Sequence, residues 1–377
     1  MTMEYATPSK RAWSPPWGGL NLRREGGMFA ALVVLCLGLW WSNPDFLGQS
    51  NIVNTTRQIA MLGIFAIGIA FVIVTGGIDL SVGSIVGLTG VLLAKMSAPY
   101  DPAMPAAGGL GLPLWVGIAV ALGVALLIGL AQGLLITRLN LQPFIVTLGG
   151  MLLLRGVSQT IVKGGSLSVS LIEVGDGYFR DLSDRGLLHV GGEPLISYPV
   201  LIFLVVVLLA AYLLHFTVFG RYVYAIGGNR EAAEYSGIPV KRVETLTYVI
   251  SAGLAGVAGI CYAAYVGQMS QQVGVAYELY AIAAAVLGGV SLRGGEGTVL
   301  GVVIGSAIMR VIDNGIIMFQ HAYRDAAGGQ QVWRLDTNWT FVIIGGVILV
   351  AVVLDQVVHL AQARRRTRLA GAKGAAG

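Results

Sequence analysis

The sequence is a succession of long apolar blocks, separated by short polar or glycine-rich segments. The blocks run for roughly 15 to 24 residues, close to the ~20 residues that an α-helix needs to cross the hydrocarbon core of a bilayer. Charged residues make up 11% of the 377-residue chain, whereas a soluble globular domain usually carries about 25%. So few charges cannot cover a water-soluble particle of this size. We therefore expect an all-α integral membrane protein.

Ten blocks are candidate transmembrane helices, and the third and eighth are short enough to be half-spanning or tilted. Several end at clusters of Gly, Pro or Asn, which commonly stop helices. The candidates are residues 26–41, 58–75, 82–97, 113–137, 144–162, 198–219, 243–266, 277–291, 298–318 and 339–358. This division predicts a polar tail over 1–25, a transmembrane domain over 26–358 and a basic tail over 359–377.

An even number of spans places both termini on the same side of the membrane. With the termini in the cytoplasm, the inner segments hold about twice as many Lys and Arg residues as the outer ones, as the positive-inside rule favours. This placement explains the net charge of +5 without a nucleic-acid partner. The first apolar block ends without a small-residue cleavage pattern, so we expect it to be retained as a helix.

Sequence motifs of catalysis are absent. No G-x-x-x-x-G-K-[ST] loop is present, so we do not expect this chain to bind and hydrolyse ATP itself. The four histidines have neither i, i+4 spacing nor a neighbouring cysteine pair, so no metal site is predicted. No G-x-S-x-G or H-E-x-x-H motif occurs, and no catalytic residue is predicted. Cys36 and Cys261 lie inside apolar blocks and are expected to be free thiols.

Several polar residues lie in or at the edge of apolar blocks. A charge facing lipid at mid-bilayer costs at least ~2.5 kcal/mol, so these side chains should face protein or a water-filled path. Arg310 and Asp313 are three residues apart on one helix face and are expected to neutralise one another. Arg155 fits an internal ion pair or a path lining equally well. The candidate path residues are Asp79, Ser81, Arg155, Glu278, Asp313 and Asn314.

The segment from Gly76 to Ser84 breaks one helix at two glycines and begins another. Asp79 or Ser81 could cap the free amide groups of the new helix. A second interpretation is a polar break that lines the translocation path, since irregular backbone at membrane depth needs water or protein around it. The two interpretations are compatible.

Glycines spaced four residues apart predict close contacts between helices, because a small face lets two helix backbones approach each other. This spacing identifies packing faces and does not locate a substrate. The pairs and triplet are Gly83 and Gly87, Gly129 and Gly133, and Gly297, Gly301 and Gly305.

The longest predicted loops are 163–197 and 319–338 outside and 220–242 inside. Both outer loops mix Asp, Gly and aromatic residues, which suits a surface that meets a soluble partner. In the inner loop, Asn229 is expected to cap a short helix with Glu231 in its first turn.

Small side chains give this inner helix a close-docking surface, and Pro239 suits the start of a second short helix. Such a rigid element suits a lever that another subunit pushes. The predicted coupling residues are Asn229, Arg230, Glu231, Ala232, Ala233, Ser236, Gly237, Ile238 and Pro239.

Four segments resemble the signatures of ABC permeases that import monosaccharides of the ribose, galactoside, arabinose and xylose type. AIGGNREAAEYSGIPVKR resembles the cytoplasmic coupling loop of that family, and three further segments match in the same chain order. These are TGGIDLSVGS (75–84), NLQPFIVTLGGMLLLRG (140–156) and YELYAIAAAVLGGVSLRGGEGTVLGVVIG (277–305). The resemblance extends over about residues 28–358.

The resemblance implies a permease of the type II ABC importer fold in a bacterial inner membrane. It implies a second permease subunit, identical or different, and a path along the axis between the two. Two separate nucleotide-binding subunits would bind ATP and Mg²⁺, and a periplasmic binding protein would deliver a monosaccharide. No cofactor is then expected on this chain.

Rival functions differ in cargo or in energy source. Related permeases handle nucleosides, autoinducer-like furanosyl compounds or branched-chain amino acids. An ion-coupled secondary carrier would need no ATPase and would transport solute alone. A membrane-embedded enzyme would need a matched acid, base or metal set, which the sequence lacks.

Overall fold

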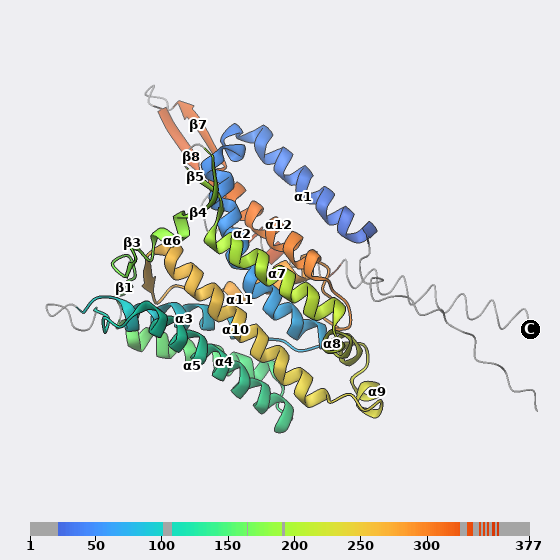
Figure 1. Ribbon diagram of the computed structural model, residues 1–377. Coiled ribbons are helices and arrows are strands. Elements are labelled where there is room, and N and C mark those ends of the chain that lie inside the picture. Colours follow the sequence, from blue (N-terminus) through green and yellow to red (C-terminus); the bar gives the residue numbers. More distant parts are fainter. Residues whose placement is uncertain are drawn as a thin grey trace, which may run out of the picture.

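A computed structural model describes residues 22–100, 108–163, 165–190, 193–324, 330–334 and scattered positions from 339 to 353. Seven of the helices in these residues are long and apolar enough to cross a membrane, and two shorter apolar helices accompany them. Most of these helices run side by side along one direction (Figure 1). The predicted all-α membrane fold is confirmed.

The long helices are α1 (Leu22–Ser42), α2 (Gln49–Val74), α4 (Leu114–Arg138), α5 (Pro143–Val162), α7 (Tyr198–Phe216), α10 (Val240–Val266) and α12 (Val299–Met318). The two shorter apolar helices are α3 (Val82–Ser97) and α11 (Tyr277–Leu287). Each of the first nine predicted blocks overlaps one of these helices. The predicted tenth block, 339–358, and the predicted tails, 1–25 and 359–377, lie largely outside the described residues.

The helix α2 begins nine residues before the predicted block at residue 58. Its first turns carry polar side chains, which a hydropathy pattern assigns to a loop. In the fold these side chains have partners: Asn51 pairs with Asn314, and Arg57 Nη1 lies 2.7 Å from Asp184 Oδ1. Satisfied polar groups can continue a helix where apolar residues alone would not predict it.

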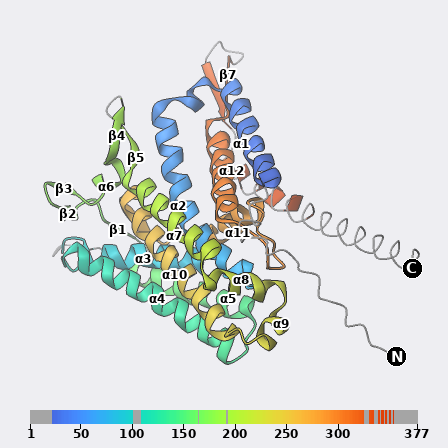
Figure 2. The same cartoon turned by 45° about the vertical axis from the view of Figure 1, so that its right-hand side comes forward.

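The core is arranged around α2, most of which is buried. The helix α10 packs along α4, α2 and α3, and α11 packs against α12 and α2. Figure 2 shows α2 passing between α12 and α7. By contrast, α4, α5 and α7 expose most of their apolar side chains, as expected for helices that face lipid.

Predicted glycines of α4 and α12 lie at close contacts between helices. A Cβ added to Gly129 or Gly133 of α4 would overlap the backbone of α10, at Tyr248 and Thr245. Gly305 of α12 likewise lies against a carbonyl oxygen of α11. The expected packing role is confirmed for these glycines, whereas Gly83 and Gly87 lie against the loop at Gly274 and Val273, and Gly297 precedes α12 and is not on its face.

Short helices and strands lie at the ends of the helix bundle. The short helices are η2 (Pro44–Leu47), α6 (Asp181–Asp184), α8 (Val218–Gly228) and α9 (Arg230–Tyr235). The strands form four antiparallel two-stranded pairs. They are β1 (Ser166–Ser168) with β6 (Gln268–Ser270), β2 (Glu173–Val174) with β3 (Gly177–Tyr178), β4 (Gly186–Val190) with β5 (Glu193–Ser197), and β7 (Gln320–Arg324) with β8 (Gln330–Arg334).

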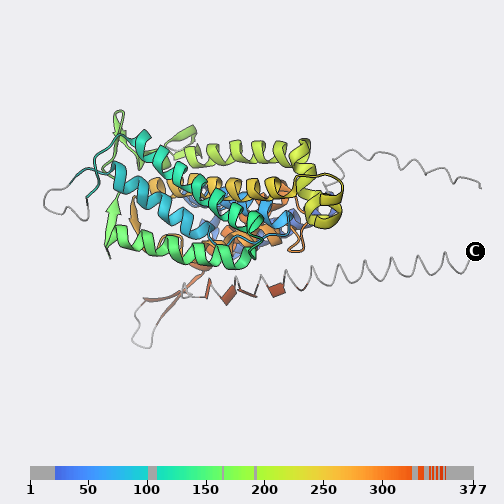
Figure 3. The same ribbon diagram turned by 90° about the horizontal axis from the view of Figure 1, so that it is seen from below.

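The two ends of the bundle are different. The strand pairs β4–β5 and β7–β8 project from one end, and the short helix α9 lies at the opposite end (Figures 1 and 3). The predicted coupling loop and the predicted outer loops are thus on opposite faces of the molecule. We refer to these faces as the α9 end and the hairpin end.

Candidate coupling and translocation sites

The short helix α9 is capped as the sequence predicts. Asn229 Oδ1 accepts the backbone N–H of Ala232 at 2.9 Å, and Glu231 lies in the first turn. The helix ends at Tyr235, and Gly237 follows with φ +81°, a conformation that favours glycine. The predicted cap is confirmed.

The predicted second short helix at Pro239 is wrong. Pro239 is the residue before α10, which continues without a break for 27 residues. Val240 and Val243 are buried, so the packed face of α10 already begins in its first turn. The coupling loop is therefore attached directly to a core helix. The first part of that loop, from Val218 to Gly228, is the helix α8.

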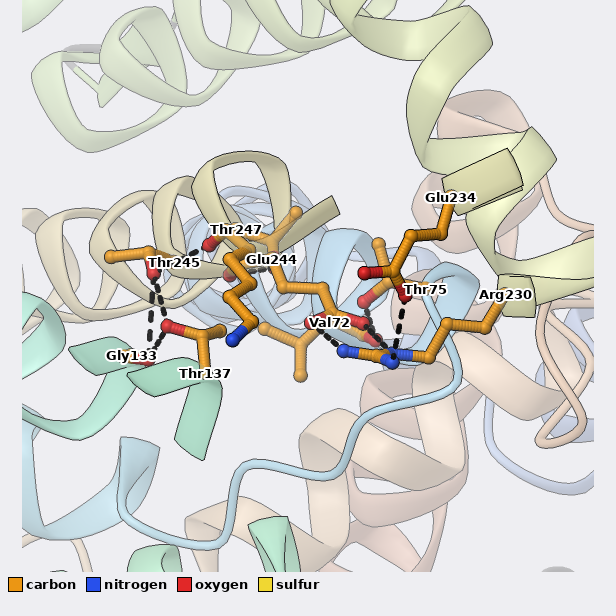
Figure 4. Close-up of polar contacts among 10 residues, drawn as sticks. Val72, Thr75, Gly133, Thr137, Arg230, Glu234, Glu244, Thr245 and Thr247 are labelled. Atoms are coloured by element: carbon orange, nitrogen blue, oxygen red, sulfur yellow. Dashed lines mark hydrogen bonds and ion pairs between the residues drawn. The ribbon is translucent and has the colours of Figure 1, made fainter. Parts of the chain in front are cut away.

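Arg230 joins α9 to α10 (Figure 4). Its Nε and Nη2 donate to the two carboxylate oxygens of Glu244 at 2.8 and 3.2 Å, and Nη1 lies 3.9 Å from Glu234 Oε2. The hydrogen bond that Arg230 donates to Glu244 raises the pKa of the guanidinium above its ordinary value. The planar fork of arginine suits this bidentate contact, which a lysine could not reproduce.

The face of α9 that remains open to a partner is small. Ala232 is exposed and Tyr235 is 91% exposed, whereas Ala233 is buried against the same chain. Sequence reasoning missed Tyr235, a large side chain that the helix leaves almost fully exposed. An exposed aromatic side chain on a short rigid helix is suited to docking into a groove of another protein.

A junction beneath α8 connects α9 to the core. The backbone N–H of Gly295 donates to the carbonyl of Val74, the last residue of α2, at 2.8 Å. A Cβ on Gly227 of α8 would overlap both groups. Tyr224 Oη donates to the carbonyl of Gly297 at 2.6 Å, and burial raises the pKa of this phenol. We call this contact region the glycine junction.

The start of α1 contacts the turn before α12, next to the glycine junction. Thr298 Oγ1 donates to Glu25 Oε1 at 2.6 Å, and Glu25 is buried. Thr298 also caps α12 by accepting the N–H of Gly301. The turn between α11 and α12 therefore contacts α1, α2 and α8 together.

Asp79 is fully buried between α2 and α3. Its Oδ1 accepts the backbone N–H and the hydroxyl of Ser81 at 2.9 and 2.7 Å, and its Oδ2 accepts the hydroxyl of Ser251 at 2.8 Å. Asp79 thus orders the turn that begins α3, while the Ser81 side chain makes no cap hydrogen bond to the helix. Gln132 of α4 lies 3.1 Å from the Ser81 hydroxyl. The buried carboxylate thus connects the start of α3 to α10, and Ser81 connects it to α4.

The charged residues of α5, α11 and α12 form two ion pairs. Arg155 Nη2 lies 4.0 Å from Glu278 Oε1, and Arg310 Nη1 lies 3.1 Å from Asp313 Oδ2. The expected neutralisation of Arg310 by Asp313 is therefore confirmed. The next residue, Asn314, exchanges two hydrogen bonds with Asn51 of α2, at 2.8 and 3.0 Å.

Some of these contacts were not visible in the sequence. Glu244, Ser251 and Tyr224 act across elements that are distant along the chain, and no local motif marks them. Gln132 did carry a signal, since it is a lone amide in a long apolar block.

Cys36 and Cys261 are free, as expected. In the part of the chain that the structure describes, no three His, Cys, Asp or Glu side chains could hold a metal ion together.

The Asp79 network makes a testable prediction about stability. Asp79→Ala leaves the Ser81 N–H and two hydroxyls without their acceptor, which should lower the free energy of unfolding by roughly 2–4 kcal/mol. Asp79→Asn keeps an acceptor for the Ser81 N–H and should cost less. Thermal unfolding of the purified chain in detergent measures both variants. Equal destabilisation by the two variants would contradict this structural role.

Comparison with known proteins covers most of the chain. The family model for the permease component of branched-chain amino acid transport systems matches residues 51–353. The ribose import permease protein RbsC of Escherichia coli is 35% identical over 346 residues, which are 92% of this chain and 96% of that protein.

Two further proteins of Escherichia coli are similar over nearly the same length. The galactose/methyl galactoside import permease protein MglC is 35% identical over 89% of this chain and 95% of its own. The inner membrane ABC transporter permease protein YjfF is 36% identical over 88% of this chain and 90% of its own. No solved structure matches the chain. The family model and these relatives agree, and the chain belongs to the family of branched-chain amino acid transport system permease components.

Proposed function

We propose that the chain is the membrane-spanning permease subunit of an ATP-driven ABC importer for a monosaccharide. The observation that carries this proposal is the agreement between the relatives and the fold. Relatives named as ribose and galactoside import permeases align over about nine tenths of the chain. The helix bundle carries a capped coupling element at one end, separated from the extended hairpins at the other.

The partners follow from the same proposal. Two nucleotide-binding subunits with ATP and Mg²⁺ dock on α9 in the cytoplasm, and a periplasmic sugar-binding protein docks on the hairpin end. A second permease subunit, identical or different, completes the path. In this proposal the chain lies in a bacterial inner membrane, and both of its termini are cytoplasmic.

The geometry of α9 supports the coupling role. The Arg230–Glu244 contact and the glycine junction connect α9 to α10, to α2 and to the turn before α12. A displacement of α9 would therefore move core helices and not only a loop. Coupling by this route requires two packed arrangements that the nucleotide state of the ATPase biases.

The proposed translocation path is lined by polar residues of the bundle. Arg155, Glu278, Asp313 and Asn314 line the path in this account, while Asp79 and Ser81 stabilise the helix break beside it. The charged members are paired with neighbours rather than exposed to lipid. Such pairing at membrane depth is usual where a polar route passes through a bundle.

Uptake by the reconstituted complex tests the function. We expect proteoliposomes with this chain, its ATPase subunits and its binding protein to take up radiolabelled ribose or galactose only when ATP is supplied to the ATPase side. The chain alone should neither take up sugar nor hydrolyse ATP. ATP hydrolysis by the purified chain, or uptake driven by an ion gradient without partners, would contradict the proposal.

Two neighbouring alanines test the docking face of α9. Ala232→Trp places a bulky ring on the exposed face and should abolish co-purification of the ATPase subunits without lowering the unfolding temperature. Ala233→Trp, at a buried position, should destabilise the chain itself by about 1–3 kcal/mol. Normal ATPase binding by Ala232→Trp would show that the partner docks elsewhere.

A further inference from the structure

Four tyrosines form a continuous row from α10 to α11. The ring centroids of Tyr265 and Tyr262 are 6.3 Å apart, those of Tyr262 and Tyr277 are 5.5 Å apart, and those of Tyr277 and Tyr280 are 6.5 Å apart. The guanidinium of Arg310 lies 5.3 Å from the Tyr280 ring centroid. The row thus connects the last turn of α10, next to β6 near the hairpin end, with the middle of α12.

The tyrosines are neither core residues nor ordinary lipid-facing residues. All four are partly exposed. Tyr265 Oη donates to Asn54 and accepts from Gln58 of α2 at 2.8 and 3.3 Å. Phenols, amides and a guanidinium gathered at membrane depth are unfavourable against hydrocarbon. This face therefore meets water or another polar surface rather than lipid.

The Arg310–Asp313 pair at the inner end of the row has unused hydrogen-bonding capacity. Asp313 is 6% exposed, yet its Oδ1 has no hydrogen-bond partner among the described residues. Arg310 Nε is likewise buried and unpaired within the described chain. Arg310 and Asp313 neutralise one another, but each keeps one buried atom without a hydrogen bond, which costs free energy. A ligand that offers a donor to Asp313 Oδ1 and an acceptor to Arg310 Nε would remove this cost.

A sugar provides this combination. Each hydroxyl can both donate and accept, so neighbouring hydroxyls can donate to Asp313 Oδ1 and accept from Arg310 Nε. The C–H face of the sugar ring packs on an aromatic ring. Binding sites for small molecules commonly combine aromatic walls with a few placed polar groups.

We infer that Tyr262, Tyr265, Tyr277, Tyr280, Arg310 and Asp313 form a sugar-contacting track from the hairpin end to the middle of the membrane. The inference rests on the proposed function and assigns the substrate-contacting residues within it. Sugar released at the hairpin end passes from ring to ring and reaches the ion pair at mid-depth. The row contains two residues of α11 and two of α10, and motion of α10 would change its geometry.

Uptake of radiolabelled ribose and galactose by the complete complex in proteoliposomes tests the track. Loss of a stacking contact of about 1.4 kcal/mol corresponds to a tenfold effect, so Tyr280→Leu should lower uptake about tenfold. ATP hydrolysis stimulated by the binding protein should persist in this variant.

Tyr280→Phe keeps the ring and should retain most uptake, whereas Asp313→Asn should lower uptake. Tyr212→Leu, at a position on α7 that is 64% exposed, is the matched control and should leave uptake unchanged.

The outcomes separate the two proposals. Failure of the wild-type complex to take up either sugar overturns the proposed function and the track with it. An active wild type together with unchanged uptake by Tyr280→Leu and Asp313→Asn overturns the track alone.

If Tyr280→Leu prevents assembly of the complex, thiol labelling tests instead whether position 280 can be reached from the hairpin side. Tyr280→Cys in a chain without Cys36 and Cys261 should react with a small charged thiol reagent added from the hairpin side. Absence of labelling in an assembled complex overturns the track.

Discussion

The end of α2 meets the turn before α12 through the hydrogen bond from Gly295 to the carbonyl of Val74, at 2.8 Å. The coupling region is arranged around this contact, because α8 can lie against both backbones only where Gly227 has no side chain. The contact leaves no space for a side chain or a water molecule between three elements. Packed backbone of this kind moves as a unit and does not bend gradually. In the proposed coupling, a displacement of α9 would therefore be passed to the core.

The polar groups inside the bundle need hydrogen-bond partners, because they are buried. Asp79 accepts three hydrogen bonds and orders the break between α2 and α3. The Arg310–Asp313 pair is different, since it keeps an unpaired donor and acceptor in the described chain. Most buried polar groups in proteins have a partner, and each exception needs an explanation; Glu25 Oε2 and Glu278 Oε2 are further exceptions in the described chain. For Asp313 the proposed sugar contact is that explanation, whereas Asp79 accepts hydrogen bonds on both oxygens and needs none.

Local sequence patterns predicted the apolar helices and the Asn229 cap well, the cap of α3 and the helix at Pro239 wrongly, and contacts between distant residues poorly. The Asn229 cap, the glycine faces and the Arg310–Asp313 pair depend on spacings of a few residues, which are visible in a single sequence. The early start of α2 was missed because Asn51 and Arg57 read as a loop unless Asn314 and Asp184 are known to face them. The tyrosine row was missed for the same reason, since Tyr262 and Tyr277 meet only in the fold. The tenth predicted span, 339–358, lies largely outside the described residues and stays a prediction.

The most direct measurement compares Gly227→Ala with Gly228→Ala in the reconstituted complex. Both are at the end of α8, but an added Cβ overlaps Val74 and Gly295 only at Gly227, and at Gly228 it meets open space. If the glycine junction carries the motion of α9 to the core, Gly227→Ala keeps basal ATP hydrolysis and loses sugar uptake and stimulation by the binding protein. Gly228→Ala should behave as the wild type. Normal uptake by Gly227→Ala would contradict the account.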